Sequence, residues 1–277
     1  MELKATLYDT DDDVATITLN RPHRGNAWTG RMHTEYRYLL DKAERDPAVR
    51  AIIVTGAGDK FCVGGDSKAL EGHSDRGGYD AGTPADLITP GEAELDAFRE
   101  DFAYHFALAK PVIVAVNGAA AGAGLVLACY ADVRFGAADA KLTTAHGPLN
   151  LPAEYGLSWL LPRLIGGSRA MELLLSSRIF LVKEAAEMGL FHKALPRDEV
   201  LPATIAYARD LITRVSPESL RQSKRQVYLD LHRDIGASVR EANTLLGAMA
   251  KQTNFKEAIR AFLDKRPANW RVDALED

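Results

Sequence analysis

Two glycine-rich turns hold the residues best suited to bind a ligand through the main chain. They are KFCVGGD at 60–66 and NGAAAGAG at 117–124, and each follows a segment that reads as a buried strand. Small residues let a ligand approach the backbone closely and let N–H groups point outward. The second turn opens an apolar helix, whose first N–H groups carry the positive end of the helix dipole. Together the turns indicate a site that stabilises an oxyanion.

Each turn alone is also open to a purely structural interpretation, because glycine after a strand commonly serves tight packing or a helix cap. Gly122-Ala123-Gly124 half-matches a dinucleotide-binding fingerprint, but Leu127 stands at the third glycine position and the turn lies in mid-chain. Neither turn ends in the Lys-Ser/Thr pair of a phosphate-binding loop.

The segments before and between these turns predict alternating strands and helices. Residues 14–20 alternate with period two, which is typical of a half-buried strand. Thr29 is a candidate N-cap for a helix that continues to Asp46-Pro47. The run at 51–55 is short and β-branched, as in a strand buried on both faces of a parallel or mixed sheet. These elements predict an α/β core.

The middle of the chain continues this pattern after an interruption. Residues 72–91 are rich in glycine, proline and acidic groups and predict a mobile surface loop. A helix is expected from about 92 to 109, then the strand VIVAV, the second glycine turn, an apolar helix and a strand near 133–135.

Helical patterns dominate after Pro162, and no strand-like alternation returns after about residue 196. The expected layout is an α/β core over 1–200 and a helical segment over 201–277. No internal repeat interrupts it.

Composition excludes several classes of protein. The 277 residues carry a formal net charge of −4, so no overall positive field favours nucleic acid or an anionic membrane. Cys62 and Cys129 are too isolated for a disulfide framework or a zinc site and are expected to be reduced thiols. The acidic N-terminus lacks the pattern of a signal peptide, and no apolar run approaches the ~18 residues of a membrane helix. We therefore expect a cytoplasmic protein without a metal.

Seven segments, in order along nearly the whole chain, resemble the crotonase superfamily, also called the enoyl-CoA hydratase/isomerase family. They are NRP at 20–22, GNA at 25–27, FCVGGD at 61–66, KPVIVAVNGAAAGAGLVLACYAD at 110–132, SWLLPRLIGGSRAMELLLS at 158–176, KEAAEMGL at 183–190 and AFLDKRPANW at 261–270. The resemblance implies a spiral of β-β-α units, a helical C-terminal region that forms a homotrimer or hexamer, and an acyl-CoA substrate. Coenzyme A would be part of that substrate, with no separate cofactor.

The resemblance also implies site residues. Gly65 and Ala123 would donate the two backbone N–H groups that hold the thioester oxygen. His23, Arg24 and Lys68 would meet the negative phosphates of coenzyme A, although each is equally open to interpretation as a solvated surface charge. The remaining substrate-binding positions are Ala27, Val63, Asp66 and Val126, with Phe262 and Lys265 supplied by a neighbouring subunit.

The sequence departs from the family pattern where hydration needs paired carboxylates. Val126 and His146 stand where family hydratases have two glutamates. Glu154, eight residues after His146, falls where some isomerases of the superfamily carry a catalytic carboxylate. It competes with a structural interpretation as a carboxylate at a helix N-terminus. His146 is a second base, an orienting residue for Glu154 or a structural histidine.

A single carboxylate suits a double-bond shift, in which one base moves a proton from C2 to C4 while the oxyanion hole stabilises the dienolate. The leading hypothesis is therefore an acyl-CoA enzyme whose chemistry is closer to isomerisation than to hydration. A second hypothesis is a hydrolase of a thioester or carbon–carbon bond that uses His146 with Glu154. A third is a catalytically silent CoA-binding scaffold. The acyl chain itself is left open.

Overall fold

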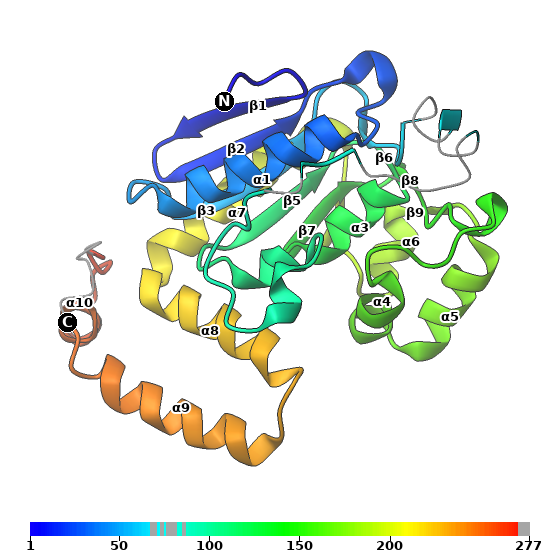
Figure 1. Ribbon diagram of the computed structural model, residues 1–277. Coiled ribbons are helices and arrows are strands. Elements are labelled where there is room, and N and C mark those ends of the chain that lie inside the picture. Colours follow the sequence, from blue (N-terminus) through cyan, green and yellow to red (C-terminus); the bar gives the residue numbers. More distant parts are fainter. Residues whose placement is uncertain (67–70, 73–74, 76–81, 85–86, 271–277) are drawn as a thin grey trace.

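The computed structural model describes residues 1–66, 71–72, 75, 82–84 and 87–270 and contains two β-sheets with helices around them (Figure 1). The larger sheet has six strands in the order β1-β2-β3-β5-β7-β10. β1 and β2 pair antiparallel and the other neighbours pair parallel. Its strands are β1 (Thr6–Asp11), β2 (Val14–Leu19), β3 (Ala51–Gly56), β5 (Val112–Val116), β7 (Val133–Ala137) and β10 (Lys193–Leu195).

The smaller sheet has four short strands in the order β4-β6-β8-β9. They are β4 (Lys60–Cys62), β6 (Ala119–Ala121), β8 (Lys141–Thr143) and β9 (Phe180–Leu181). β4, β6 and β8 run parallel to one another. The chain alternates between the sheets, because β3, β5 and β7 are each followed by a strand of the smaller sheet. This confirms the expected spiral of β-β-α units.

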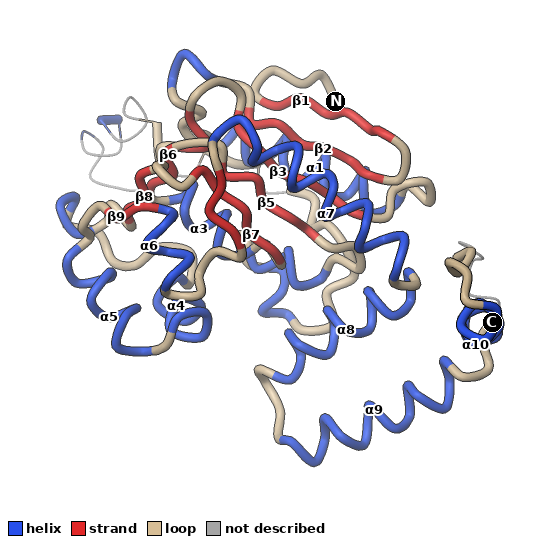
Figure 2. The backbone as a smooth tube through the Cα atoms, turned by 180° about the vertical axis from the view of Figure 1, so that it is seen from behind, coloured by secondary structure: helices blue, strands red, loops and turns tan. Residues whose placement is uncertain are grey.

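Helices cover both faces of the larger sheet. α1 (Gly30–Arg45) begins where Thr29 Oγ accepts a hydrogen bond from the backbone N–H of Met32 at 3.2 Å, as its predicted N-cap role requires. Figure 1 shows α1 in front of this sheet, and Figure 2, from behind, shows α7 (Val200–Arg214) on the opposite face. The predicted helical segment after residue 200 thus begins with a helix that packs on the sheet.

The remaining helices of the body follow the smaller sheet. They are α3 (Ala123–Tyr130), α4 (Leu157–Ile165), α5 (Gly167–Ser176) and α6 (Val182–Glu187). All eight residues of α3 are buried, so its polar function is limited to its two ends. The core formed by these helices and the sheets is continuous, with β3 and β5 buried on both faces as their apolar sequences predict.

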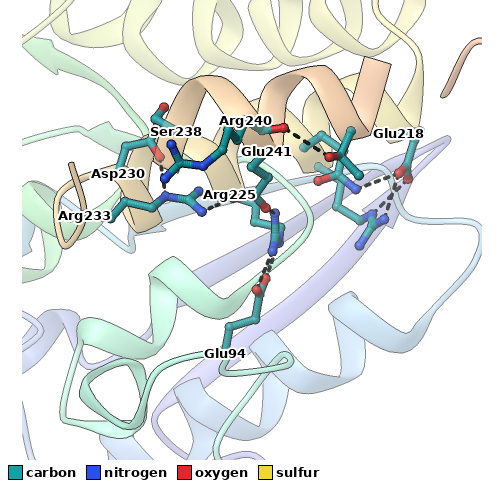
Figure 3. A network of polar contacts seen from close by, with 11 residues as sticks. Glu94, Glu218, Arg225, Asp230, Arg233, Ser238, Arg240 and Glu241 are labelled. Atoms are coloured by element: carbon teal, nitrogen blue, oxygen red, sulfur yellow. Dashed lines mark hydrogen bonds and ion pairs between the residues drawn. The ribbon is translucent and has the colours of Figure 1, made fainter. Parts of the chain in front are cut away.

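α8 (Pro217–Asp230) packs on the body, where Tyr228 stacks on Phe106 with ring centroids 3.9 Å apart and Lys224 pairs with Asp132. The last two helices, α9 (Ile235–Met249) and α10 (Thr253–Asp264), form an arm that extends from the body (Figure 1). No residue of α9 is buried. Its attachment is polar: Glu241 pairs with Arg225 and Arg233, and Arg225 also pairs with Glu94 (Figure 3). At the end of the arm, Trp270 Nε1 donates a hydrogen bond to the Thr213 carbonyl at 2.8 Å.

Two expectations about the elements were wrong. The single helix expected over 92–109 is replaced by two short 3-10 helices, η2 (Asp96–Arg99) and η3 (Ala103–Ala107). Between them Phe102 has φ +63°, which no right-handed helix can contain. The expected strands were also too few, since β1, β10 and the short strands of the smaller sheet had no predicted counterpart. Half of the loop expected at 72–91 lies outside the described residues.

Candidate active site

Three neighbouring strand ends bring the predicted functional segments to one edge of the smaller sheet. β4, β6 and β8 are parallel neighbours, so their carboxyl ends lie side by side. β4 leads into Gly65, β6 into Ala123 and β8 into His146. Carboxyl ends of adjacent parallel strands are a common place for ligand binding in α/β proteins. The sheet order thus assembles residues that are up to 81 positions apart in the chain.

The first oxyanion donor predicted, Gly65, lies in a strand-like segment with a free N–H. Trp28 brackets it, because the Trp28 N–H donates to the Gly64 carbonyl at 2.7 Å and the Asp66 N–H donates to the Trp28 carbonyl at 3.1 Å. In the part of the chain that is described, the Gly65 N–H has no acceptor. Its neighbours are therefore fixed while its own donor stays available.

The second predicted donor, Ala123, is the first residue of α3, so its N–H lies at the positive end of that helix. Gly122 before it has φ +47°, ψ −122°, a conformation that favours glycine. No side chain caps the helix. Among the described residues the Ala123 N–H also has no acceptor.

The two turns touch through their backbones. A Cβ on Gly124 would lie 2.1 Å from the Cys62 carbonyl oxygen, so only glycine fits there. A Cβ on Gly122 would lie 3.8 Å from Gly64 Cα. The start of α3 is therefore packed directly on the end of β4, and the N–H groups of Gly65 and Ala123 belong to one small region.

His146 is buried at the end of the β8 segment, and its Nδ1 has no hydrogen-bond partner among the described residues. The preceding residue, Ala145, has φ +60°, an uncommon conformation for alanine. Ser177 Oγ contacts both sides of this bend, since it accepts from the Gly147 N–H at 3.1 Å and pairs with Thr144 Oγ at 3.0 Å. Buried polar atoms without partners and strained backbone both concentrate at functional sites.

Glu154 lies half-buried in the loop before α4. Burial raises the pKa of its carboxyl above the usual 4.5, and the nearby His146 opposes that shift. The residue after it, Tyr155, has φ +52°. The direction of the pKa shift is the one that a general base working near neutral pH needs.

An apolar pocket of about 500 Å³ begins next to Glu154, where Tyr155 and Gly156 line it. Tyr130, the last residue of α3, also lines the pocket and donates a hydrogen bond from its hydroxyl to the Tyr155 carbonyl at 2.7 Å. α3 therefore extends from the Ala123 N–H at one end to the pocket at the other.

Two of the predicted substrate-binding residues pair with each other. Asp66 is buried and accepts from Arg21 Nη2 at 3.0 Å and Arg24 Nη2 at 3.3 Å. Arg21 also donates to the Ala27 carbonyl at 2.7 Å. These contacts hold the segment around Ala27 against the first glycine turn, so Arg24 and Asp66 have a structural role whatever ligand they meet.

The other predicted residues are spread over three places. Ala27 and Val126 are buried, Val63 is partly exposed on the first turn, and His23 is exposed in the 3-10 turn η1 (Pro22–Arg24). Lys68 lies outside the described residues. Phe262 and Lys265 are exposed on and just after α10, far from the strand ends in the same chain (Figures 1 and 2).

Sequence reasoning missed the ring side chains that line the pocket. They come from five separate segments: Phe98, Phe106, Tyr130, Tyr155 with Trp159, and His232. The signal that was available is the density of aromatic residues in FREDFAYHF at 98–106, which lies within the segment expected to be a single helix.

Metal sites and membrane-spanning helices are both absent from the described part of the chain. No group of three or more His, Cys, Asp or Glu side chains is placed to hold a metal ion. No helix there combines the length and apolar character that crossing a bilayer requires.

Known proteins are similar to this chain over nearly its whole length. The profile of the family described as Enoyl-CoA hydratase/isomerase matches residues 9–273. The 1,2-epoxyphenylacetyl-CoA isomerase of Escherichia coli is 33% identical over 270 residues, covering 94% of this chain and 95% of the relative. The crotonyl-CoA hydratase of Syntrophomonas wolfei is 28% identical over 271 residues, covering 98% and 99%. The crystal structure of an enoyl-CoA hydratase from Bacillus anthracis superimposes with a TM-score of 0.85 at 26% identity, covering 98% of this chain and all of that one.

Proposed function

The chain belongs to the enoyl-CoA hydratase/isomerase family, a family of lyases and isomerases that act on CoA thioesters, and we propose that it moves the double bond of an acyl-CoA. This proposal is carried by the presence of one carboxylate, Glu154, together with the N–H groups of Gly65 and Ala123 at adjacent strand ends, which have no acceptor among the described residues. Val126 stands where hydration would need a second carboxylate.

In the proposed reaction the N–H groups of Gly65 and Ala123 donate hydrogen bonds to the thioester oxygen. Negative charge grows on that oxygen when a proton leaves C2, so the dienolate is held more tightly than the substrate. The dipole of α3 adds to this stabilisation at Ala123. Both donors are fixed by the packing of α3 on β4, which lowers the reorganisation needed during reaction.

Glu154 is the proposed base. It removes the proton from C2, the electron pair moves through the dienolate, and the same carboxyl returns the proton to C4. No atom is gained or lost overall. Burial favours the neutral acid that forms halfway. Because Glu154 is only half-buried, this acid exchanges its hydrogen with solvent before it protonates C4.

The relative named an isomerase supports this choice, because its match extends over nearly the full length of both chains. That relative acts on a phenylacetyl-CoA derivative by its name. The match to a named hydratase at lower identity supports the CoA thioester as the substrate class common to both reactions.

A hydrolytic reaction is the second candidate, and one observation favours it. The buried Nδ1 of His146 has no partner in the described structure, and the histidine is close enough to Glu154 to affect its pKa. Such a pair could direct water onto a carbonyl carbon and release free coenzyme A from a thioester.

A second copy of the chain is proposed to complete the site. Phe262 and Lys265 lie on the arm, where they cannot reach the strand ends of their own chain, and they are exposed. In an assembly of three or six copies they would meet the nucleotide end of the CoA bound to a neighbour.

Product analysis on three thioesters tests these alternatives. A 3-enoyl-CoA should be converted to its 2-enoyl isomer, with no free coenzyme A. Crotonyl-CoA should gain water far more slowly than the about 1–10³ s⁻¹ of ordinary enzymes. Release of coenzyme A would establish the hydrolytic candidate, rapid hydration would overturn the role given to Val126, and a chain that binds acyl-CoA without turnover would be a scaffold.

A further inference from the structure

The walls of the pocket beside Glu154 are mainly rings that hold one another in place. Its volume of about 500 Å³ is that of a small-molecule site. The rings of Trp159 and His232 stack with centroids 5.6 Å apart, and Phe98 meets His232 edge-on at 5.8 Å. Arg163 lies over the outer side of Trp159, 3.9 Å from its centroid. Fixed ring faces and edges favour a flat aromatic guest over a flexible alkyl chain.

The pocket is also at the right distance from the predicted oxyanion donors. α3 rises about 10 Å from Ala123 to Tyr130 at 1.5 Å per residue. Tyr130 and Tyr155 both line the pocket, and Tyr155 directly follows Glu154. An acyl group whose carbonyl lies at Ala123 therefore has to extend about 10 Å to reach Tyr130, so the pocket meets the distal end of the acyl group.

One carboxylate in this apolar pocket has a fixed position and a free oxygen. Asp101 lines the pocket, and its Oδ1 lies 3.2 Å from Arg37 Nη1 and 3.6 Å from His33 Nε2. Burial lowers the pKa of His33 to about 4, so at neutral pH the positive charge beside Asp101 comes from Arg37. Among the described residues no donor contacts Asp101 Oδ2.

Arg37 in turn is held from the other side. Its guanidinium donates to the Ile88 carbonyl at 2.5 Å and to Thr89 Oγ1 at 3.2 Å, and it lies over the Tyr104 ring at 4.8 Å. The buried arginine thus fixes one oxygen of Asp101 and leaves the other as a charged hydrogen-bond acceptor, which a hydroxyl donor satisfies well.

We propose that this pocket binds an aryl ring at the distal end of the acyl group and that Asp101 accepts a hydrogen bond from a hydroxyl on that ring. The substrate class is then a hydroxyaryl acyl-CoA. This inference rests on the proposed function, because it takes the thioester carbonyl to lie at Gly65 and Ala123.

Equilibrium binding of three saturated thioesters tests the proposal without turnover. Calorimetry with decanoyl-CoA, 4-phenylbutanoyl-CoA and 4-(4-hydroxyphenyl)butanoyl-CoA compares acyl groups of equal carbon number. The phenyl compound should bind about 3- to 10-fold more tightly than decanoyl-CoA. The ring hydroxyl should add about a further tenfold.

Two variants connect these differences to named side chains. Trp159→Leu should remove the preference for the phenyl compound over decanoyl-CoA. Asp101→Asn keeps the size of the side chain and an oxygen for Arg37, but replaces the free charged acceptor by an amide, so the gain from the hydroxyl should fall to threefold or less. Asp96→Asn is the matched control, because its carboxylate lies on η2 in the same segment, is fully exposed and does not line the pocket.

The possible results distinguish failure of the aryl pocket from failure of the proposed function. If none of the three thioesters binds, the proposed function itself fails. If all three bind with equal affinity while a 3-enoyl-CoA is still isomerised, the function stands and the aryl pocket is wrong. If the hydroxyl gain persists in Asp101→Asn, Asp101 is not its acceptor and the hydroxyaryl assignment is overturned.

Discussion

The role proposed for Ala123 uses only its backbone N–H, so a change of side chain keeps the donor and a change to proline removes it. Proline is tolerated at the first position of a helix, where its missing N–H breaks no helical hydrogen bond. Ala123→Pro should therefore fold, as circular dichroism can check, and should lower turnover about 10²–10³-fold. Ala123→Gly keeps the donor and is the control. Full activity in a folded proline variant would remove Ala123 from the oxyanion hole.

The raised pKa of Glu154 has two consequences, which change in opposite directions as pH rises. The base works ionised, so kcat/KM should rise with pH through a midpoint above 4.5. The neutral form is favoured in the folded state, so the stability it contributes is present below the unfolded pKa and is lost as pH rises through the folded pKa. Thermal unfolding should show Glu154→Gln gaining on the parent between pH 4 and pH 7. A constant difference across that range would contradict the shift.

Which site residues the sequence predicted depends on how their function is encoded. Gly65 and Ala123 lie in glycine-rich turns that can be recognised in the sequence. The structure places both at one edge of the smaller sheet. Asp101 gave no signal, because its function depends on contacts among segments distant in the chain. Arg24 and Asp66 were expected to meet a ligand. Their mutual ion pair joins residues that are distant in the chain, so no local sequence pattern could predict it.

Among the elements, α9 depends on charge for its position, because it has no buried residue. Glu241 connects α9 to the preceding segment, since it pairs with Arg225 and Arg233 (Figure 3). Ion pairs of this partly exposed kind contribute about 0.2–1 kcal/mol each. Glu241→Gln should therefore speed amide hydrogen exchange in α9 about two- to fivefold in a single chain.

The control for this change is Asp210→Asn, which breaks an exposed pair with Arg214 within α7. It should leave exchange in α9 unchanged. High salt should reduce the difference between the Glu241 variant and the parent, because screening weakens the same pairs in the parent. Equal exchange in α9 for parent and variant at low salt would show that the arm is held by something else.

Element prediction succeeded where local signals are strong and failed where packing decides. α1 has a threonine cap and a clear apolar period, and β3 is a β-branched run. The segment 92–109 has many aromatic residues but no α-helix, because Phe102 turns inward. Its ring centroid lies 5.3 Å from that of Trp28 and 5.0 Å from that of Tyr155. Strands of two or three residues, such as β9, are too short to carry a period.

The whole molecule exposes apolar side chains that a monomer would not be expected to leave in water. On α10, Ile259, Phe262 and Leu263 are 46%, 80% and 71% exposed, and their spacing of three and four residues places them on one face of the helix. Clusters of this kind mark interaction surfaces, and oligomers of identical chains are commonly closed and symmetric. Sedimentation should therefore show a trimer or a dimer of trimers. Phe262→Glu should shift the distribution toward smaller species, whereas a parent that stays monomeric at all concentrations would contradict the proposed assembly.

Proton transfer by Glu154 is the step on which the proposed reaction depends, and deuterium incorporation measures it directly. A 3-enoyl-CoA incubated in heavy water with the parent should give a 2-enoyl product carrying deuterium at C4. Glu154→Gln keeps size and polarity but removes the base, so incorporation should fall about 10²–10⁴-fold. If the variant exchanges as fast as the parent, Glu154 is a helix-end carboxylate only, and the double-bond shift does not proceed through it.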